Sequence, residues 1–279
     1  MAKKVKKHPD EMSFLDHLEE LRWHLIRATL AVVIIATVAF IFKGTLFEIV
    51  FGPQNPDFVS YDILCKISQF FGAEKGCIAD GDMDFIIQSR KVAGQFSAAI
   101  WTSIMAGVVI GFPYILYEFW KFISPGLYEN ERKSSKGFIV VASFLFFLGA
   151  AFGYFVVAPL SINFLATFKI SDAVQNEFDI DSFIGLVRAS VLASGLIFEL
   201  PIIMYFLTKI GLVTPEFLKK NRKYALVIVL ILAAIITPPD ISTQVIVAVP
   251  IIILYEVSIF ISRGVIRREK RRLKKEGLA

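Results

Sequence analysis

The chain has 279 residues, of which 56% are hydrophobic and 20% are charged, and its formal net charge is +5. The mean hydropathy of +0.64 is too high for a soluble domain, because a soluble core cannot bury so many long apolar segments. The composition therefore excludes the soluble globular class and predicts a membrane protein, in which lipid surrounds the apolar faces of the helices.

Six apolar segments follow one another along the chain, and a helix needs about 20 residues to cross the hydrocarbon core of a bilayer. Four segments reach that length, namely 25–42, 98–119, 138–159 and 186–207. The fifth, 224–236, stops at the sequence TPPD, and the sixth, 245–261, is interrupted by Pro250 and Glu256. We therefore predict an all-α polytopic membrane protein with six transmembrane helices, of which the last two, helices five and six, are short.

The distribution of Lys and Arg predicts the orientation of these helices, because short loops rich in these residues stay in the cytoplasm. The N-terminus, the second and fourth connections and the C-terminal tail are basic, whereas the third connection has one Lys against four acids. The N and C termini are therefore predicted to be cytoplasmic. The pI of 9.1 follows from this asymmetry, so we expect a lipid-bilayer partner and no nucleic acid.

We predict a single membrane domain, 1–279, with a basic N-terminus (1–12), a six-helix core (13–263) and a basic tail (264–279). The first external connection, 44–89, is the longest and contains both cysteines, Cys65 and Cys77. An oxidising compartment allows a disulfide between them, whereas two unpaired thiols are the alternative. Apolar residues at helical spacing in YDILCKISQFFG predict a short helix that lies on the membrane surface or caps the bundle.

The residues that most enzymes need are missing from the predicted membrane core. All three histidines lie within the first 24 residues, so the sequence has no His cluster for a catalytic metal, and it has neither an HExxH nor a P-loop pattern. Ser194, within a predicted helix, has no His or Lys in reach. We therefore predict no enzymatic activity, no metal and no cofactor.

Acidic side chains inside the predicted helices are a stronger functional signal. Glu199 lies near the middle of the fourth helix, where a charge costs about 2.5–3.5 kcal/mol on insertion scales. Its nearest basic neighbour along the helix, Arg188, is about 16 Å away, and Pro201 is expected to bend the helix at the same depth. For Glu256, the favoured interpretation is that its side chain reaches towards Arg263 near the cytoplasmic end, and a functional role is the alternative.

A second group of acids lies on the predicted cytoplasmic side. Ser13 and Asp16 have the spacing of a capping box, so a helix is predicted to begin there and to continue into the first span. Glu20 follows in this helix, and Glu131 lies in the second connection. Two carboxylates on one surface suit two Arg side chains, because each guanidinium matches a carboxylate with two hydrogen bonds. The alternative for Glu20 is an ion pair with His24 or a nearby Arg.

Five motifs occur in order along the chain: FLDHLEELRWHL, YILYEFWKFISPGLYENER, FGYFVVAPL, SGLIFELPI and TPPDISTQ. From about residue 13 to residue 263, they resemble the TatC family, the core membrane subunit of the twin-arginine protein translocase. The resemblance implies six helices in a curved, glove-like arrangement in the bacterial cytoplasmic (inner) membrane. It also implies a receptor that binds the twin-arginine signal peptides of folded cargo proteins, which are exported at the expense of the proton-motive force.

The implied partners are TatA-type single-span subunits and further copies in a multi-subunit complex, while a separate TatB-type subunit is left open. The resemblance assigns signal-peptide binding to Glu20, Glu131, Arg22, Phe122 and Glu19, of which Glu19 is an extra acid that departs from the family pattern. Glu199 and Gln244 are expected to contact the signal peptide or a partner helix within the membrane. The resemblance also implies that Pro53 and Asp240 are external positions needed for function.

Two other functions compete with this interpretation. A proton-coupled transporter of small solutes would use Glu199 as its titrating carboxylate, but it predicts internal repeats and paired broken helices, which the sequence lacks. A passive assembly scaffold differs from a receptor because it would not prefer Arg-Arg over Lys-Lys in a bound peptide.

Overall fold

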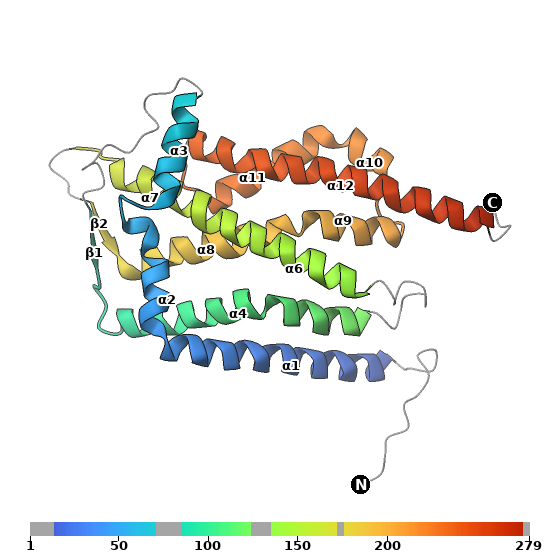
Figure 1. Cartoon of the computed structure of the whole chain (residues 1–279), viewed down its shortest axis with the longest axis horizontal. Coiled ribbons are helices and arrows are strands. Elements are labelled where there is room, and N and C mark those ends of the chain that lie inside the picture. Colours follow the sequence, from blue (N-terminus) through green and yellow to red (C-terminus); the bar gives the residue numbers. More distant parts are fainter. Residues whose placement is uncertain (1–13, 71–84, 124–134, 172–175, 276–279) are drawn as a thin grey trace, which may run out of the picture. The chain divides into compact units, whose positions relative to one another are not determined.

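The computed structural model describes residues 14–70, 85–123, 135–171 and 176–275, and most of them are helical (Figure 1). The chain forms two compact units. The first combines Met1–Leu46 with Ala99–Phe144, and the second combines Phe47–Ala98 with Leu145–Ala279. The all-α class is therefore confirmed, while the single membrane domain stays a prediction.

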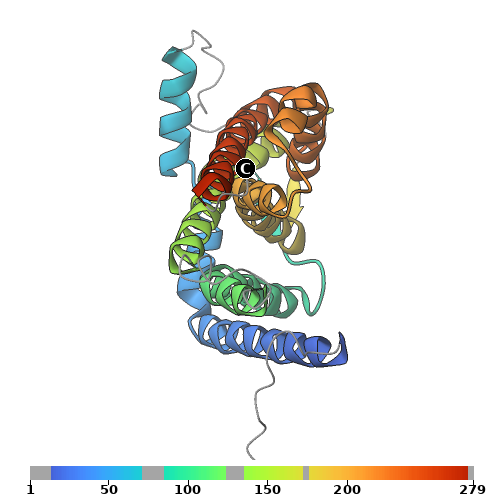
Figure 2. The ribbon, with the colours of Figure 1, turned by 90° about the vertical axis from the view of Figure 1, so that its right-hand side faces the viewer.

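Two long helices, α1 (Phe14–Ile41, blue) and α4 (Gly94–Ile123, green), lie side by side in Figures 1 and 2. Their contact lies in the first unit and depends on small residues. A Cβ added to Gly107 of α4 would lie only 2.6 Å from the carbonyl oxygen of Val32 in α1, and Gly111 follows one turn later on the same face. A Gly-x-x-x-Gly pair brings membrane helices close, because no side chain separates the backbones.

The remaining elements belong wholly or largely to the second unit (Figure 1). In chain order they are α2 (Lys43–Val50), η2 (Gly52–Gln54), α3 (Val59–Phe70), β1 (Ile86–Gln88), α6 (Ser135–Phe152), η5 (Gly153–Val157), α7 (Ala158–Thr167), β2 (Glu177–Asp179), α8 (Ile180–Phe198), α9 (Leu200–Lys209), α10 (Pro215–Lys220), α11 (Arg222–Ile236) and α12 (Ile241–Lys275). Two of them, α2 and α6, begin in the first unit. The helix α3 confirms the short helix predicted in the first external connection.

The two short strands join two connections that are far apart in the sequence. β1 and β2 pair in parallel, with Ile86 opposite Glu177. Two ion pairs strengthen this junction, because Arg90 pairs with Glu177 at 3.0 Å and Lys91 pairs with Asp181 at 3.1 Å. The hydrogen bond and charge of Asp181 raise the pKa of Lys91 above its usual value.

The second unit has its own close helix contact, between the end of α6 and the middle of α8. A Cβ added to Gly149 would lie 2.6 Å from the carbonyl oxygen of Ser194, and one added to Gly153 would meet the carbonyl group of Ser190. Small residues four apart on both helices thus face one another, which is the packing that membrane helices favour. Directly after α6, at Gly153, the helix widens into the π-helical turn η5.

Among the described residues, five helical segments are long and apolar enough to cross a membrane: Leu18–Ile41, Gly94–Ile123, Gly137–Thr167, Ile180–Lys209 and Thr243–Arg271. They coincide with five of the six predicted spans. The other predicted span is α11, a helix of 15 residues. It is about 22 Å long at 1.5 Å per residue, which is shorter than a bilayer core of about 30 Å. The short fifth helix is thus confirmed, and a sixth crossing stays a prediction.

The prediction that the sixth helix is short is wrong. α12 has 35 residues and continues through Pro250 and Glu256 without a break. Pro250 removes a single backbone donor, which a helix packed against others can tolerate. Glu256 pairs with Arg222 at 2.6 Å on an exposed surface, so its charge does not interrupt the helix. The expected pairing of Glu256 with Arg263 is therefore also wrong.

Candidate functional site

A buried contact between a histidine and a carboxylate links α1 to α4 within the first unit. The ring Nδ1 of His24 lies 2.5 Å from Oε2 of Glu118, and only 3% of Glu118 is exposed. Arg27 Nη1 lies 3.9 Å from the same carboxylate oxygen, and Tyr114, one turn earlier on α4, also interacts with this carboxylate. A buried carboxylate is costly unless it is paired, so this cluster fixes the register of the two helices.

Phe122, one of the predicted signal-peptide residues, belongs to this cluster. It lies one turn after Glu118 on α4, and its ring meets the ring of His24 edge to face, with centroids 6.3 Å apart. Leu21, Leu25 and Ala28 of α1, together with Phe119 of α4, complete the apolar lining around the pair. The aromatic position and the buried ion pair thus form one packed unit.

The two predicted acids of α1, Glu19 and Glu20, precede His24 by about one helical turn. Glu20 is half-buried and lies one turn before His24, whereas Glu19 and Arg22 are exposed. Within the described part of the chain, His24 pairs with Glu118 rather than with Glu20, so the alternative pairing of Glu20 with His24 is wrong. Glu131 lies outside the described residues, and its proximity to Glu20 stays a prediction.

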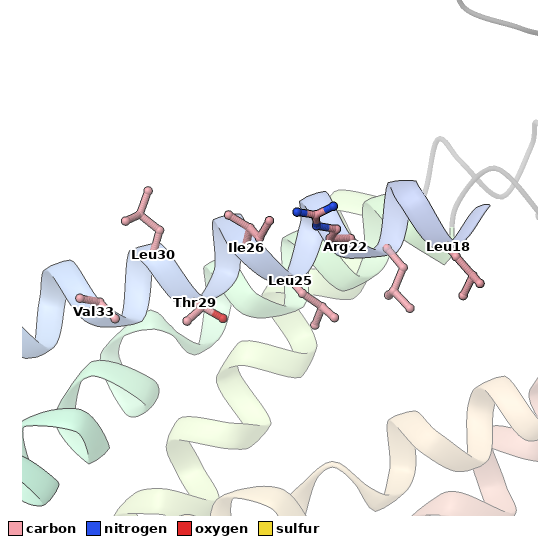
Figure 3. Close-up of a pocket in the computed structure, with 8 residues that line it drawn as sticks. Leu18, Arg22, Leu25, Ile26, Thr29, Leu30 and Val33 are labelled. Carbon is pink, nitrogen blue, oxygen red and sulfur yellow. The ribbon is translucent and has the colours of Figure 1, made fainter. Parts of the chain in front are cut away.

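The exposed face of α1 carries an open apolar groove of about 560 Å³ (Figure 3). Its lining comes from α1 alone: Leu18, Leu21, Arg22, Leu25, Ile26, Thr29, Leu30 and Val33. The guanidinium of Arg22 lies among these apolar side chains in Figure 3. An apolar face on a predicted membrane helix suits lipid tails as well as a protein partner, so we assign no ligand to this groove.

Glu199 lies at a break within the fourth predicted span. α8 ends at Phe198 and α9 begins at Leu200, and the Glu199 N–H bonds to the Leu196 carbonyl three residues earlier. Pro201 explains the break, because it has no N–H to continue the helical hydrogen bonds. Glu199 is 7% exposed, and its Oε1 has no hydrogen-bond partner in the described structure. The helix is thus interrupted at the depth where a bend was predicted, and Glu199 is a buried acid.

Gln244 and Asp240 have structural contacts in the α11–α12 hairpin. The Gln244 side chain donates a hydrogen bond of 3.0 Å to the Leu230 carbonyl oxygen of α11. Asp240 accepts from both the backbone N–H and the hydroxyl of Thr243, each at 2.7 Å, and so caps the first turn of α12. These contacts account for both residues as supports of the tight turn, and a partner contact of Gln244 stays a prediction.

Pro53 is buried in the turn η2 that follows α2. Its carbonyl oxygen accepts a hydrogen bond of 2.6 Å from the hydroxyl of Tyr61 in α3, and burial raises the pKa of that hydroxyl well above its usual value. Pro53 therefore anchors α3 to the turn. Cys65 of α3 is disulfide-bonded, but Cys77 lies outside the described residues, so the pairing of the two stays a prediction.

Glu118 is the site residue that the sequence reasoning missed. It lies at the end of the predicted apolar span 98–119, and an acid inside a predicted membrane helix is the same signal that points to Glu199. In the part of the chain that the structure describes, no group of three or more His, Cys, Asp or Glu residues could hold a metal ion.

The chain matches the family model described as Sec-independent protein translocase protein (TatC) over residues 16–250. It is 44% identical to TatC of Blattabacterium over 259 residues, covering 92% of this chain and 97% of the relative, and 36% identical to TatC of Aquifex aeolicus, covering 93% and 98%. A crystal structure titled twin arginine translocase receptor TatC has a TM-score of 0.67 and 34% identity, covering 89% of this chain and 99% of the other. The chain therefore belongs to the TatC family of Sec-independent protein translocase components.

Proposed function

We propose that this translocase component is the receptor for twin-arginine signal peptides, and that it docks the arginine pair at Glu20 and Glu131. The observation that carries the proposal is the packing of His24 with Glu118 and Phe122 one helical turn after Glu20, because it holds in place the part of α1 that carries one of the two carboxylates. The similarity to a solved TatC titled as a receptor supports the same function.

Each docked guanidinium would form a charge-assisted, two-bonded contact with a carboxylate. Such hydrogen bonds contribute about 1.5–3 kcal/mol each when they are partly shielded from water. Glu20 is half-buried, which gives that shielding, whereas a fully exposed pair would contribute less than about 1 kcal/mol. Lys makes only a point-charge contact, so a peptide with Lys-Lys is expected to bind more weakly.

After docking, the apolar part of the signal peptide would enter the membrane beside Glu199. A buried acid at a helix break is costly in a bilayer and marks a place where a polar group of the peptide or of a partner helix could approach. TatA-type helices would be recruited against α11, whose 15 residues favour local thinning of the bilayer. We place the protein in the bacterial inner membrane with both termini in the cytoplasm, as the Lys and Arg distribution indicates.

The test is peptide binding to the purified full-length protein in detergent. Two signal peptides that differ only in Arg-Arg against Lys-Lys are titrated into wild type, Glu20→Gln and Glu131→Gln. Wild type is expected to favour Arg-Arg by at least about tenfold, which is 1.4 kcal/mol, and each variant should lose most of that preference. Glu216→Gln, which removes an exposed acid of α10, is the matched control and should behave as wild type. Equal binding of both peptides by wild type would refute the receptor function.

A further inference from the structure

The C-terminal end of α12 extends past the helices that pack beside it in the second unit. Thr208, near the end of α9, forms a hydroxyl–hydroxyl hydrogen bond of 2.8 Å with Ser262 of α12. α9 ends at Lys209, whereas α12 continues to Lys275, and its red end projects beyond α9 and α10 in Figure 1. Residues 263–275 add about 20 Å of helix at 1.5 Å per residue.

This extension is strongly basic. Residues 263–275 contain eight Arg or Lys residues and a single acid, Glu269. The side chains of Arg267, Arg268 and Arg271 are exposed, and none of the three forms a salt bridge within the described part of the chain. The extension is therefore a dense and largely unneutralised positive surface on a single helix.

The distance of each charge from the apolar segment of α12 suggests what neutralises it. The Cα atoms of Arg267 and Arg268 lie about 9–11 Å along the helix from Ile261, where the apolar segment ends, and those of Arg271 and Lys274 lie about 15–20 Å from it. Helical side chains point back toward the N-terminus, which here is the direction of the bilayer. The inner two guanidinium groups can thus reach the headgroup layer, which is about 5–8 Å thick.

We propose that the basic extension of α12 binds the phosphate groups of anionic lipids where the helix leaves the bilayer, with Arg267 and Arg268 as the direct ligands. A guanidinium matches a phosphate with two hydrogen bonds and tolerates partial dehydration. Arg271 and Lys274 lie about one Debye length farther out, so they attract the same lipids only weakly. The proposal depends neither on the side of the membrane that the extension faces nor on signal-peptide binding.

The experiment uses two double variants that remove the same charge at different distances, R267Q/R268Q and R271Q/K274Q. The full-length protein in detergent is titrated with phosphatidylglycerol and, as the neutral control, with phosphatidylcholine, and bound lipids are counted by native mass spectrometry. A third titration uses oligouridylate, because RNA is the rival polyanion. All substituted side chains are exposed, so the thermal unfolding midpoint of each variant should match wild type.

Wild type is expected to prefer phosphatidylglycerol over phosphatidylcholine. R267Q/R268Q should weaken phosphatidylglycerol binding on the order of tenfold, and R271Q/K274Q by less than about threefold, because the contribution of each charge falls with its distance from the surface. Equal losses in the two variants, or no preference of wild type for the anionic lipid, would overturn the proposal. Tighter binding of oligouridylate than of phosphatidylglycerol, with the larger loss in R271Q/K274Q, would replace the lipid by RNA.

Discussion

The His24–Glu118 pair joins two side chains that are 94 positions apart in the sequence, one on α1 and one on α4. Glu20 lies one turn before His24, and Phe122 lies one turn after Glu118 and touches the His24 ring. The pair therefore controls how an acid of α1 and an aromatic ring of α4 are positioned for the proposed docking of a signal peptide. We expect its loss to change both the stability of the protein and its selectivity for Arg-Arg.

Removal of one partner should destabilise the protein more than removal of both. His24→Leu leaves the buried Glu118 carboxylate with its contact to Tyr114 and the longer contact to Arg27, and we expect it to cost about 3 kcal/mol of unfolding free energy. The double variant His24→Leu/Glu118→Leu should cost clearly less than the sum of the single variants, because no buried carboxylate is left without its partner. Thermal and denaturant unfolding in detergent measure these differences, and additive effects would contradict the pairing.

The exposed pair of Arg222 with Glu256 serves as the control for this cycle. Its hydrogen bond of 2.6 Å is nearly as short as the 2.5 Å of the buried pair, but about half of each side chain is exposed. Solvent screens such pairs, so Glu256→Gln should change the unfolding free energy by no more than about 1 kcal/mol. The comparison separates the effect of burial from the effect of a short distance.

The sequence predicts the local structure around a residue where a local rule applies, but it does not predict a contact whose partner lies in a distant segment. Pro201 follows Glu199 closely, so the break at Glu199 was readable from the sequence. The partners of Glu118 and Glu256 depend on how α1 meets α4 and how α11 meets α12, and a single sequence does not contain that register. Glu118 could have been noticed as an acid within an apolar span, but His24 could not have been assigned to it.

At the scale of helices, the contact of α1 with α4 depends on Gly107. Gly107→Ala places a methyl group 2.6 Å from the Val32 carbonyl oxygen, which forces the helices apart, and we expect a loss of about 1–3 kcal/mol of unfolding free energy. Gly137→Ala in α6 is the matched control, because nothing lies within 4 Å of its added methyl group. That variant should be neutral or slightly stabilising, since Ala favours helices over Gly. Equal behaviour of the two variants would show that the glycine contact is unimportant.

Helix ends were harder to predict than helices. The residues Pro250 and Glu256 predict a short α12, but the helix continues past both. Packing against other helices tolerates Pro250, and Arg222 pairs with the Glu256 charge. Asp240 and Gln244, expected as functional positions, cap α12 and tie it to α11. Polar residues next to a tight turn are often needed for the turn itself, and the sequence alone does not separate that need from a role in binding.

At the scale of the whole molecule, the proposed function assigns the passage of cargo to the membrane beside the short helix α11. A helix of 15 residues spans about 22 Å, so the bilayer beside it would have to thin by several ångströms from its usual core of about 30 Å. Thinning lowers the barrier that a polar, folded passenger meets. Within this proposal, α11 creates a weak zone in the membrane, and its shortness is required for export rather than for binding of the signal peptide.

Lengthening α11 tests this division of roles. Insertion of four leucines after Ala225 adds about one turn between Arg222 and Leu230, so we expect it to keep the Leu230 contact with Gln244 and to displace the exposed Arg222–Glu256 pair. We expect export of a folded reporter to fall at least about tenfold, because the longer helix removes the mismatch that thins the bilayer. Binding of the Arg-Arg peptide to the purified variant should stay within about twofold of wild type, since α1 and α4 are unchanged.

Four alanines inserted at the same place give a less apolar helix of equal length and should impair export less. Full export with the leucine insertion would show that bilayer thinning at α11 is not part of the mechanism.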